Sequence, residues 1–138
     1  MMTANFPLKE ETYRIIGAAM EVYNVLGYGF RETVYQEALE REFALRQLSF
    51  HAQPEIAIRY KDRLLRHHLV PDFVISGRII VEIKALDALT NRETEQCLHY
   101  LTASKLDIVL LLNFGAPKKL GYTRIVAPHL LVIGTNAP

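Results

Sequence analysis

Cysteine and tryptophan are almost missing from this chain of 138 residues, which has one cysteine and no tryptophan. The single cysteine, Cys97, cannot form an internal disulfide bond, and no Cys/His spacing typical of a zinc site surrounds it. No apolar stretch approaches the roughly 20 residues that a transmembrane helix needs. Charged residues also precede the first apolar run, which is not the layout of a signal peptide. We therefore expect a cytoplasmic protein with no membrane segment.

A strong net charge is missing as well, because the formal net charge is only +1. The two parts of the chain differ, however: residues 1–58 carry five basic and eight acidic side chains, and residues 59–138 carry eleven and seven. The densest group of cations consists of Arg59, Lys61, Arg63 and Arg66. A polyanion could bind there, although a solvated hairpin surface would explain the same charges.

The composition is otherwise that of an ordinary globular domain, with 50% hydrophobic and 22% charged residues. Such a balance argues against disorder, and this length suits one domain with one hydrophobic core. We see no internal repeat and no linker. A single domain over residues 1–138 is therefore expected.

The spacing of apolar residues predicts three helices. Apolar positions recur at steps of three and four over residues 9–26 and 31–46, which is typical of amphipathic helices. A capping box formed by Thr90 and Glu93 starts the third helix, which we expect to end near Ala103.

The rest of the pattern predicts strands. Alternating or continuous apolar runs occur over residues 55–60, 64–75, 78–86, 107–114 and 122–126. The expected order is therefore ααβββαββ. This order describes a mixed α/β (α+β) domain.

Two opposite charges stand in the expected strand over residues 78–86. Side chains alternate along a strand, so Glu82 and Lys84 lie on one face, while the other face is wholly apolar. Charges in so apolar a strand are costly to bury without partners. An exposed sheet edge with a cross-strand ion pair would explain them equally well.

Asp72 favours a functional interpretation of these charges. The turn signal at Ser76 and Gly77 folds the preceding strand back and brings Asp72 near the level of Glu82. Two nearby carboxylates repel unless a cation lies between them, and hard oxygen ligands suit Mg²⁺ or Mn²⁺. Beside that ion, Lys84 would orient water or stabilise charge on a phosphate.

These residues form a known motif. Pro71-Asp72 and Glu82-Ile83-Lys84 give P-D-x9-E-x-K, for which the PD-(D/E)XK nuclease superfamily is named. Residues 29–35 add G-x-x-E-x-x-Y at the start of the second helix. The chain resembles the bacterial GxxExxY proteins of that superfamily over nearly its whole length, including residues 95–101 and 112–117.

The resemblance implies a restriction-endonuclease-like core, a mixed sheet with a central antiparallel hairpin meander flanked by helices. It implies that Asp72, Glu82 and Glu32 bind Mg²⁺ or Mn²⁺ and that Lys84 is the catalytic lysine. From the residues alone, the preferred interpretation is that Glu32 is a first-turn acid favoured by the helix dipole and that Tyr35 belongs to the core.

A second helix contributes weaker candidates. Gln96 and Tyr100 match the Q-x3-Y accessory motif of RecB-type members and, at i and i+4, share a helix face. They would contact a phosphate or bound water, but a solvated glutamine and a core tyrosine explain them almost as well.

The expected activity is metal-dependent hydrolysis of a phosphodiester bond in nucleic acid, with DNA favoured as substrate. The alternative is a catalytically silent module that keeps the fold and binds nucleic acid or a protein partner. The sequence leaves open whether a protein partner or a homodimer is involved.

Overall fold

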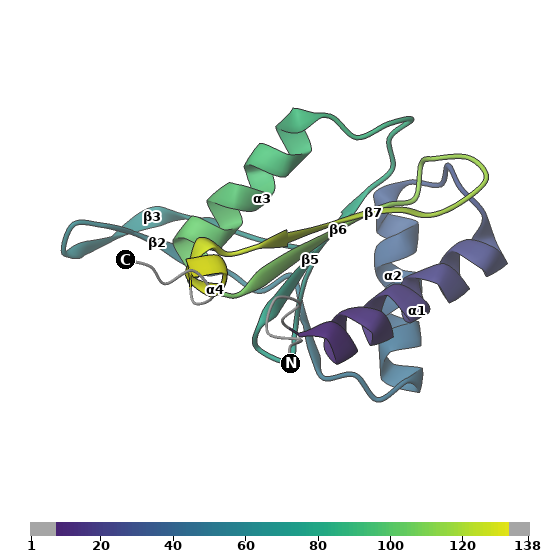
Figure 1. The fold of residues 1–138 in the computed structure, drawn as a ribbon, viewed down its shortest axis with the longest axis horizontal. Coiled ribbons are helices and arrows are strands. Elements are labelled where there is room, and N and C mark those ends of the chain that lie inside the picture. The colour runs from purple at the N-terminus through teal and green to yellow at the C-terminus, as the bar shows by residue number, and fades with distance from the viewer. Residues whose placement is uncertain (1–7, 133–138) are drawn as a thin grey trace.

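A five-stranded mixed sheet forms the centre of the structure, a computed structural model that describes residues 8–132 (Figure 1). The strands lie in the order β1-β4-β5-β6-β7; β5 and β6 pair in parallel and all other pairs are antiparallel. Their bounds are β1 (Phe50–Ala52), β4 (Phe73–Ile75), β5 (Ile79–Lys84), β6 (Ile108–Asn113) and β7 (Gly121–Val126).

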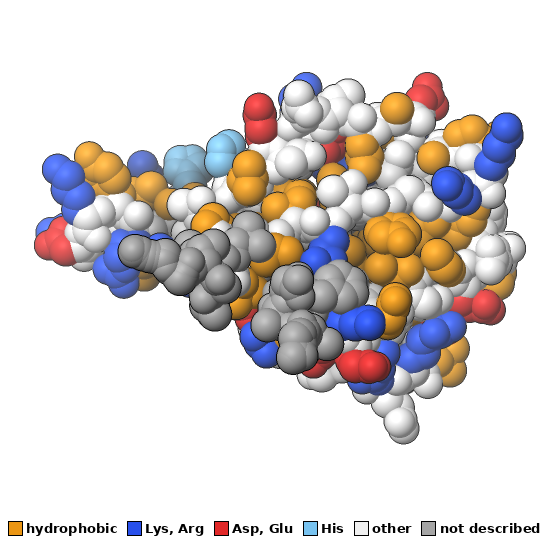
Figure 2. Space-filling model, in the orientation of Figure 1, with side chains coloured by type: hydrophobic (Ala, Val, Ile, Leu, Met, Phe, Trp, Pro, Cys, Tyr) orange, Lys and Arg blue, Asp and Glu red, His pale blue; other side chains and the backbone are white. Residues whose placement is uncertain are grey.

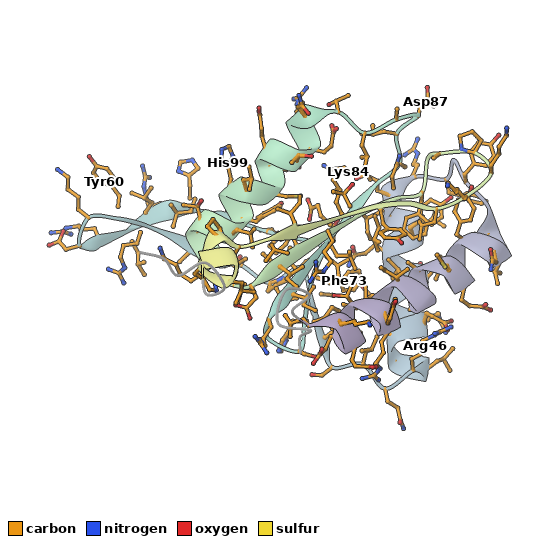
Figure 3. The ribbon with its side chains drawn as sticks, in the orientation of Figure 1. Arg46, Tyr60, Phe73, Lys84, Asp87 and His99 are labelled. Atoms are coloured by element: carbon orange, nitrogen blue, oxygen red, sulfur yellow. The ribbon has the colours of Figure 1, made fainter. Side chains whose placement is uncertain are left out.

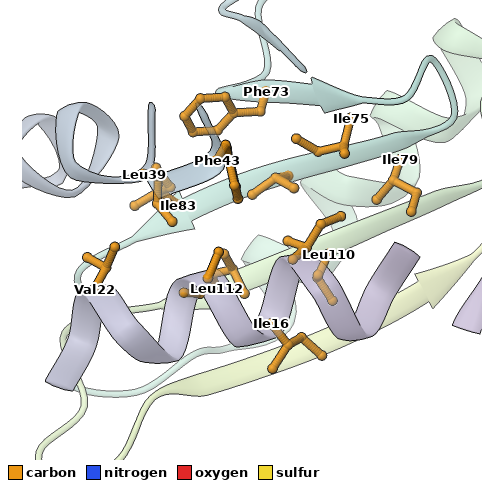
Figure 4. Packing of buried hydrophobic residues seen from close by; sticks show 14 of the residues in the cluster. Ile16, Val22, Leu39, Phe43, Phe73, Ile75, Ile79, Ile83, Leu110 and Leu112 are labelled. Carbon is orange, nitrogen blue, oxygen red and sulfur yellow. The ribbon is translucent and has the colours of Figure 1, made fainter. Parts of the chain in front are cut away.

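Helices cover both faces of this sheet. On one face α1 (Lys9–Leu26) and α2 (Glu32–Leu45) pack over a large cluster of buried aliphatic and aromatic side chains (Figure 4). On the other face α3 (Asn91–Ser104) covers a smaller cluster. The short α4 (Pro128–Val132) follows β7.

The two layers explain the apolar composition of the middle strands. Along β5, Ile79, Val81 and Ile83 belong to the cluster under α1 and α2, whereas Ile80 belongs to the cluster under α3. All of β6 is buried. Strands covered on both faces are expected to be continuously hydrophobic, so a polar side chain in β5 needs a special reason to be there.

A two-stranded hairpin projects from the body of the molecule, and we call it the arm (Figure 1). It consists of β2 (Ile56–Tyr60), β3 (Arg63–Leu69) and the turn between them. Its strand β2 packs against α3, Ile56 and Leu69 contact the core, and the rest of β3 is exposed.

The predicted fold class is confirmed, with a mixed sheet, flanking helices and a central β4–β5 hairpin. The predicted strand over residues 64–75 is wrong as one element: it is divided into β3 and β4, which belong to different sheets. Pro71 lies at the break, where it has no N–H to continue a ladder. Two short elements, β1 and α4, were not predicted, so the observed order is ααβββββαββα.

Within residues 8–132, no helix combines the length and the apolar character needed to cross a membrane. The longest helix, α1, instead has an exposed polar side, with Glu10 and Arg14 among its exposed residues.

One close backbone approach fixes the end of the sheet that carries the site. Gly115 follows β6 so closely beside Leu86 that a Cβ atom added there would collide with the Leu86 backbone. At Gly121 an added Cβ would lie 3.5 Å from the Cβ atom of Asn113, an ordinary contact.

We therefore expect Gly115→Ala to lower the free energy of unfolding by about 1–3 kcal/mol, the usual cost of overpacking. The matched variant Gly121→Ala should change it by less than about 0.5 kcal/mol. Urea denaturation followed by circular dichroism measures both. Equal stability of the two variants would show that the approach at Gly115 is not a constraint.

Candidate active site

Asp72 and Glu82 meet at the open end of the β4–β5 hairpin. Phe73 pairs with Val81, so Asp72 comes opposite Glu82, one step beyond the ladder. Each carboxylate accepts a backbone hydrogen bond from the other strand: the Asp72 N–H donates to Glu82 Oε1 (3.1 Å), and the Ile83 N–H donates to Asp72 Oδ2 (2.7 Å). Side chains thus continue the pairing where the ladder stops.

Glu82 is almost fully buried, with an exposed fraction of 6%. It lies on the face of the sheet that α3 covers, where the Tyr100 hydroxyl donates a hydrogen bond of 3.1 Å to Glu82 Oε2. Both carboxylate oxygens therefore have a partner, as a buried acid requires. Tyr100 anchors this carboxylate and is itself part of the core under α3.

Both acids have a raised pKa, and burial is the main cause in each case. Burial raises the pKa of Glu82 to about 7, the Asp72 carboxylate adds to this, and hydrogen bonds and the Lys84 ammonium oppose it. Burial also raises the pKa of Asp72, against the Ile83 N–H, and the Glu32 carboxylate raises it further. Both carboxyl groups are therefore biased toward their protonated form.

A hollow of about 570 Å³ opens between the end of β5 and the first turns of α3, and neither Asp72 nor Glu82 is among its lining residues. Lys84 lies in its wall (Figure 3). The lining residues are Glu32, Lys84, Leu86, Arg92, Glu93, Glu95, Gln96 and His99. The hollow thus joins Glu32, Lys84 and Gln96, which are far apart in the sequence.

The G-x-x-E-x-x-Y segment brings Glu32 to this place. Glu32 is exposed, and its Oε2 accepts a hydrogen bond of 3.3 Å from the Ala85 N–H, one residue after Lys84. Gly29 has φ +93° and donates its N–H to the Phe114 carbonyl. Tyr35 is buried, stacks on Phe114 at 4.3 Å between ring centroids and donates to the Gly27 carbonyl. The first and last residues of the motif therefore fix the loop and helix start that carry Glu32.

Asn113 supports the site, although the sequence analysis did not single it out. This side chain, 2% exposed, accepts the Leu86 N–H (2.9 Å) and donates to the Leu86 carbonyl (3.0 Å). It also accepts the Gly115 N–H at 3.0 Å. The chain after Lys84 is thereby held in place. The signal for Asn113 in the sequence was an amide side chain at the end of an otherwise apolar strand.

A comparison with models of protein families matches residues 9–125 to the PD-(D/E)XK nuclease superfamily. The chain belongs to this superfamily. No curated protein matches the chain at a significant level. Among solved structures, the crystal structure of SSO0001 is similar, with a TM-score of 0.56 and 17% identity over 70% of this chain. The chain spans about half of that protein (50%), and the likeness shows the fold alone.

PD-(D/E)XK nucleases generally use divalent metals, so we tested whether the residues present fit one. Asp72 and Glu82 offer hard oxygen donors at one place, the kind of ligand that Mg²⁺ or Mn²⁺ prefers. Within residues 8–132, however, no three acidic, histidine or cysteine side chains are grouped closely enough to hold an ion. Glu32 stands beside the pair and is not part of such a group. Carboxylate oxygens suit a divalent metal, and the described residues bring two carboxylates together, those of Asp72 and Glu82.

The basic group predicted to bind a polyanion lies elsewhere. Arg59, Lys61, Arg63 and Arg66 belong to the arm, and none of them lines the hollow. Tyr60 of the arm and Lys84 of the hollow lie in separate parts of the molecule (Figure 3). Gln96 is exposed in the wall of the hollow, whereas Tyr100 contacts Glu82 from beneath.

The raised pKa of Glu82 predicts how stability depends on pH without metal. Between about pH 4.5 and 7 the native protein holds a proton that the unfolded chain loses, so the free energy of unfolding should fall as pH rises through this range, by roughly 3 kcal/mol. Glu82→Gln should remove most of this fall. Denaturation in EDTA at several pH values measures it, with Glu37→Gln, an exposed acid of α2, as the control. A pH dependence that survives Glu82→Gln would assign the shift to another group.

Proposed function

We propose that this protein is a metal-dependent phosphodiester hydrolase that acts on nucleic acid, with DNA as substrate. The observation that carries the proposal is the crossed pair of Asp72 and Glu82 beside Lys84, in a member of the PD-(D/E)XK nuclease superfamily. The links among Gly29, Glu32 and Tyr35 give the G-x-x-E-x-x-Y motif a structural role, and we propose that the chain belongs with the GxxExxY proteins.

In this proposal Asp72 and Glu82 would hold Mg²⁺ or Mn²⁺, with Glu32 as a third acid near them. A divalent cation supplies a Lewis acid that acidifies water and neutralises charge on a phosphate. The hydrogen bonds from the Asp72 N–H, the Ile83 N–H and the Tyr100 hydroxyl orient both carboxylates in advance. Hydrogen-bond partners that hold the ligands in place are usual at metal sites.

Lys84 has the position to act on the substrate. It follows Glu82 by two residues on the same strand face and lines the hollow that a phosphodiester would enter. Its ammonium group donates hydrogen bonds to phosphate oxygens as negative charge develops on them. Gln96 and Arg92, in the wall opposite, are placed to contact a neighbouring phosphate.

A binding module without turnover is the second candidate. One observation favours it: no three-membered cluster of metal ligands occurs among the described residues. Under this hypothesis Lys84 is one of several cations that contact phosphates.

Replacing Lys84 distinguishes the two functions. In an enzyme, Lys84→Ala should reduce cleavage of labelled DNA in Mg²⁺ or Mn²⁺ by at least about a hundredfold, because charge stabilisation in the transition state is lost. DNA affinity, measured in EDTA, should change little. Asp72→Ala should likewise prevent cleavage, and Lys105→Ala, an exposed lysine after α3, serves as the control.

In a binding module, Lys84→Ala should only weaken binding modestly and reduce its salt dependence by about one phosphate contact. Wild-type protein that binds DNA and cuts neither DNA nor RNA with any of these ions would contradict the enzyme.

A further inference from the structure

The arm extends beyond the body of the molecule, and β3 is exposed up to Leu69 (Figure 1). Its strand β2 also packs against α3, so the hairpin is not isolated. It nevertheless exposes large apolar side chains: Tyr60 and Leu64 are each 60% exposed and Leu65 is 44% exposed. Because the hairpin projects from the body, these side chains are accessible to a binding partner (Figure 1).

The charge of the arm indicates what that partner is. Between residues 56 and 69 it has four cations (Arg59, Lys61, Arg63 and Arg66) against the single carboxylate of Asp62. The chain as a whole has a net charge of only +1, so positive charge is concentrated on the arm. Figure 2 shows Lys and Arg side chains on both long edges of the arm. A polyanion is the complementary ligand.

The pairing of the two strands adds information about shape. Near the tip, Arg59 pairs with Leu64 and Tyr60 pairs with Arg63. Paired residues share a face and successive pairs alternate. Near the tip, each face of the arm therefore carries one cation and one apolar side chain. A ribbon that docks flat on a protein would have one apolar and one polar face. Cations on both faces suit a ligand with charged walls on both sides.

We propose that the arm lies in a groove of duplex DNA and binds the phosphates along both of its walls, while the cleavage site holds another part of the same duplex. The proposal rests on the proposed function. The major groove admits a two-stranded β-ribbon, and a phosphate backbone runs along each side of it. The seven residues of β3 span roughly 23 Å, enough to follow several phosphates.

A second copy of the chain is the less favoured partner. Two arms brought together would place cations against cations, which costs free energy when the charges face each other directly. The exposed apolar side chains alternate with these cations and form no continuous apolar face.

The test removes two arm charges and compares the result with the loss of two charges elsewhere. Arg63→Gln/Arg66→Gln is the arm variant, and Arg41→Gln/Lys105→Gln, from exposed positions on the body, is the control of equal net charge. Binding to a duplex of about 30 base pairs is measured by fluorescence anisotropy in EDTA over a range of salt. Cleavage of that duplex in Mn²⁺ gives kcat and KM.

For the arm variant we expect a Kd raised roughly tenfold at about 0.1 M salt and a salt slope lower by about two. KM should rise with kcat unchanged, since the arm touches no reacting atom. The control should match the wild-type protein.

Three outcomes would overturn the proposal: an arm variant that binds the duplex like the control, an equal loss of affinity for single-stranded DNA, or a change from dimer to monomer in sedimentation with duplex affinity unchanged. Wild-type protein that neither binds nor cuts the duplex would instead refute the proposed function itself. Failure of the proposed role of the arm can therefore be distinguished from failure of the proposed function.

Discussion

The buried carboxylate of Glu82 is the constraint on which the site depends. A charge in so apolar a strand is unfavourable unless it is paired, and here the Asp72 N–H and the Tyr100 hydroxyl satisfy its oxygens. The Asp72 carboxylate, brought close by the same hairpin, raises the pKa of Glu82 further, whereas the Asp72 N–H lowers it. Strain of this kind is common at functional sites, because a bound cation removes it.

Much of this arrangement could be predicted from short-range patterns. Strand alternation places Glu82 and Lys84 on one face, and the turn at Ser76 and Gly77, both with positive φ, sets the distance back to Asp72. The capping box of Thr90 correctly located the start of α3. These features depend on residues that lie within one hairpin or one helical turn, where the sequence itself limits the geometry.

Other features depend on contacts between distant segments, which periodicity does not report. The hydrogen bonds of Asn113 to Leu86 follow from the parallel pairing of β5 with β6. The sequence of neither strand predicts that pairing. The separation of β3 from β4 was missed because residues 64–75 look continuous, although Pro71 marked the break. The arm in turn became recognisable only once its exposure was known.

Mn²⁺ binding measured by isothermal titration calorimetry tests the central claim most directly. Near pH 6.5, in two buffers of different ionisation enthalpy, we expect saturable binding with release of a proton, because burial and Asp72 raise the pKa of Glu82 to about 7. Both the binding and the proton release should be lost in Asp72→Asn. Undetectable binding at millimolar Mn²⁺, or binding that is unchanged in Asp72→Asn, would contradict a metal site at this carboxylate pair.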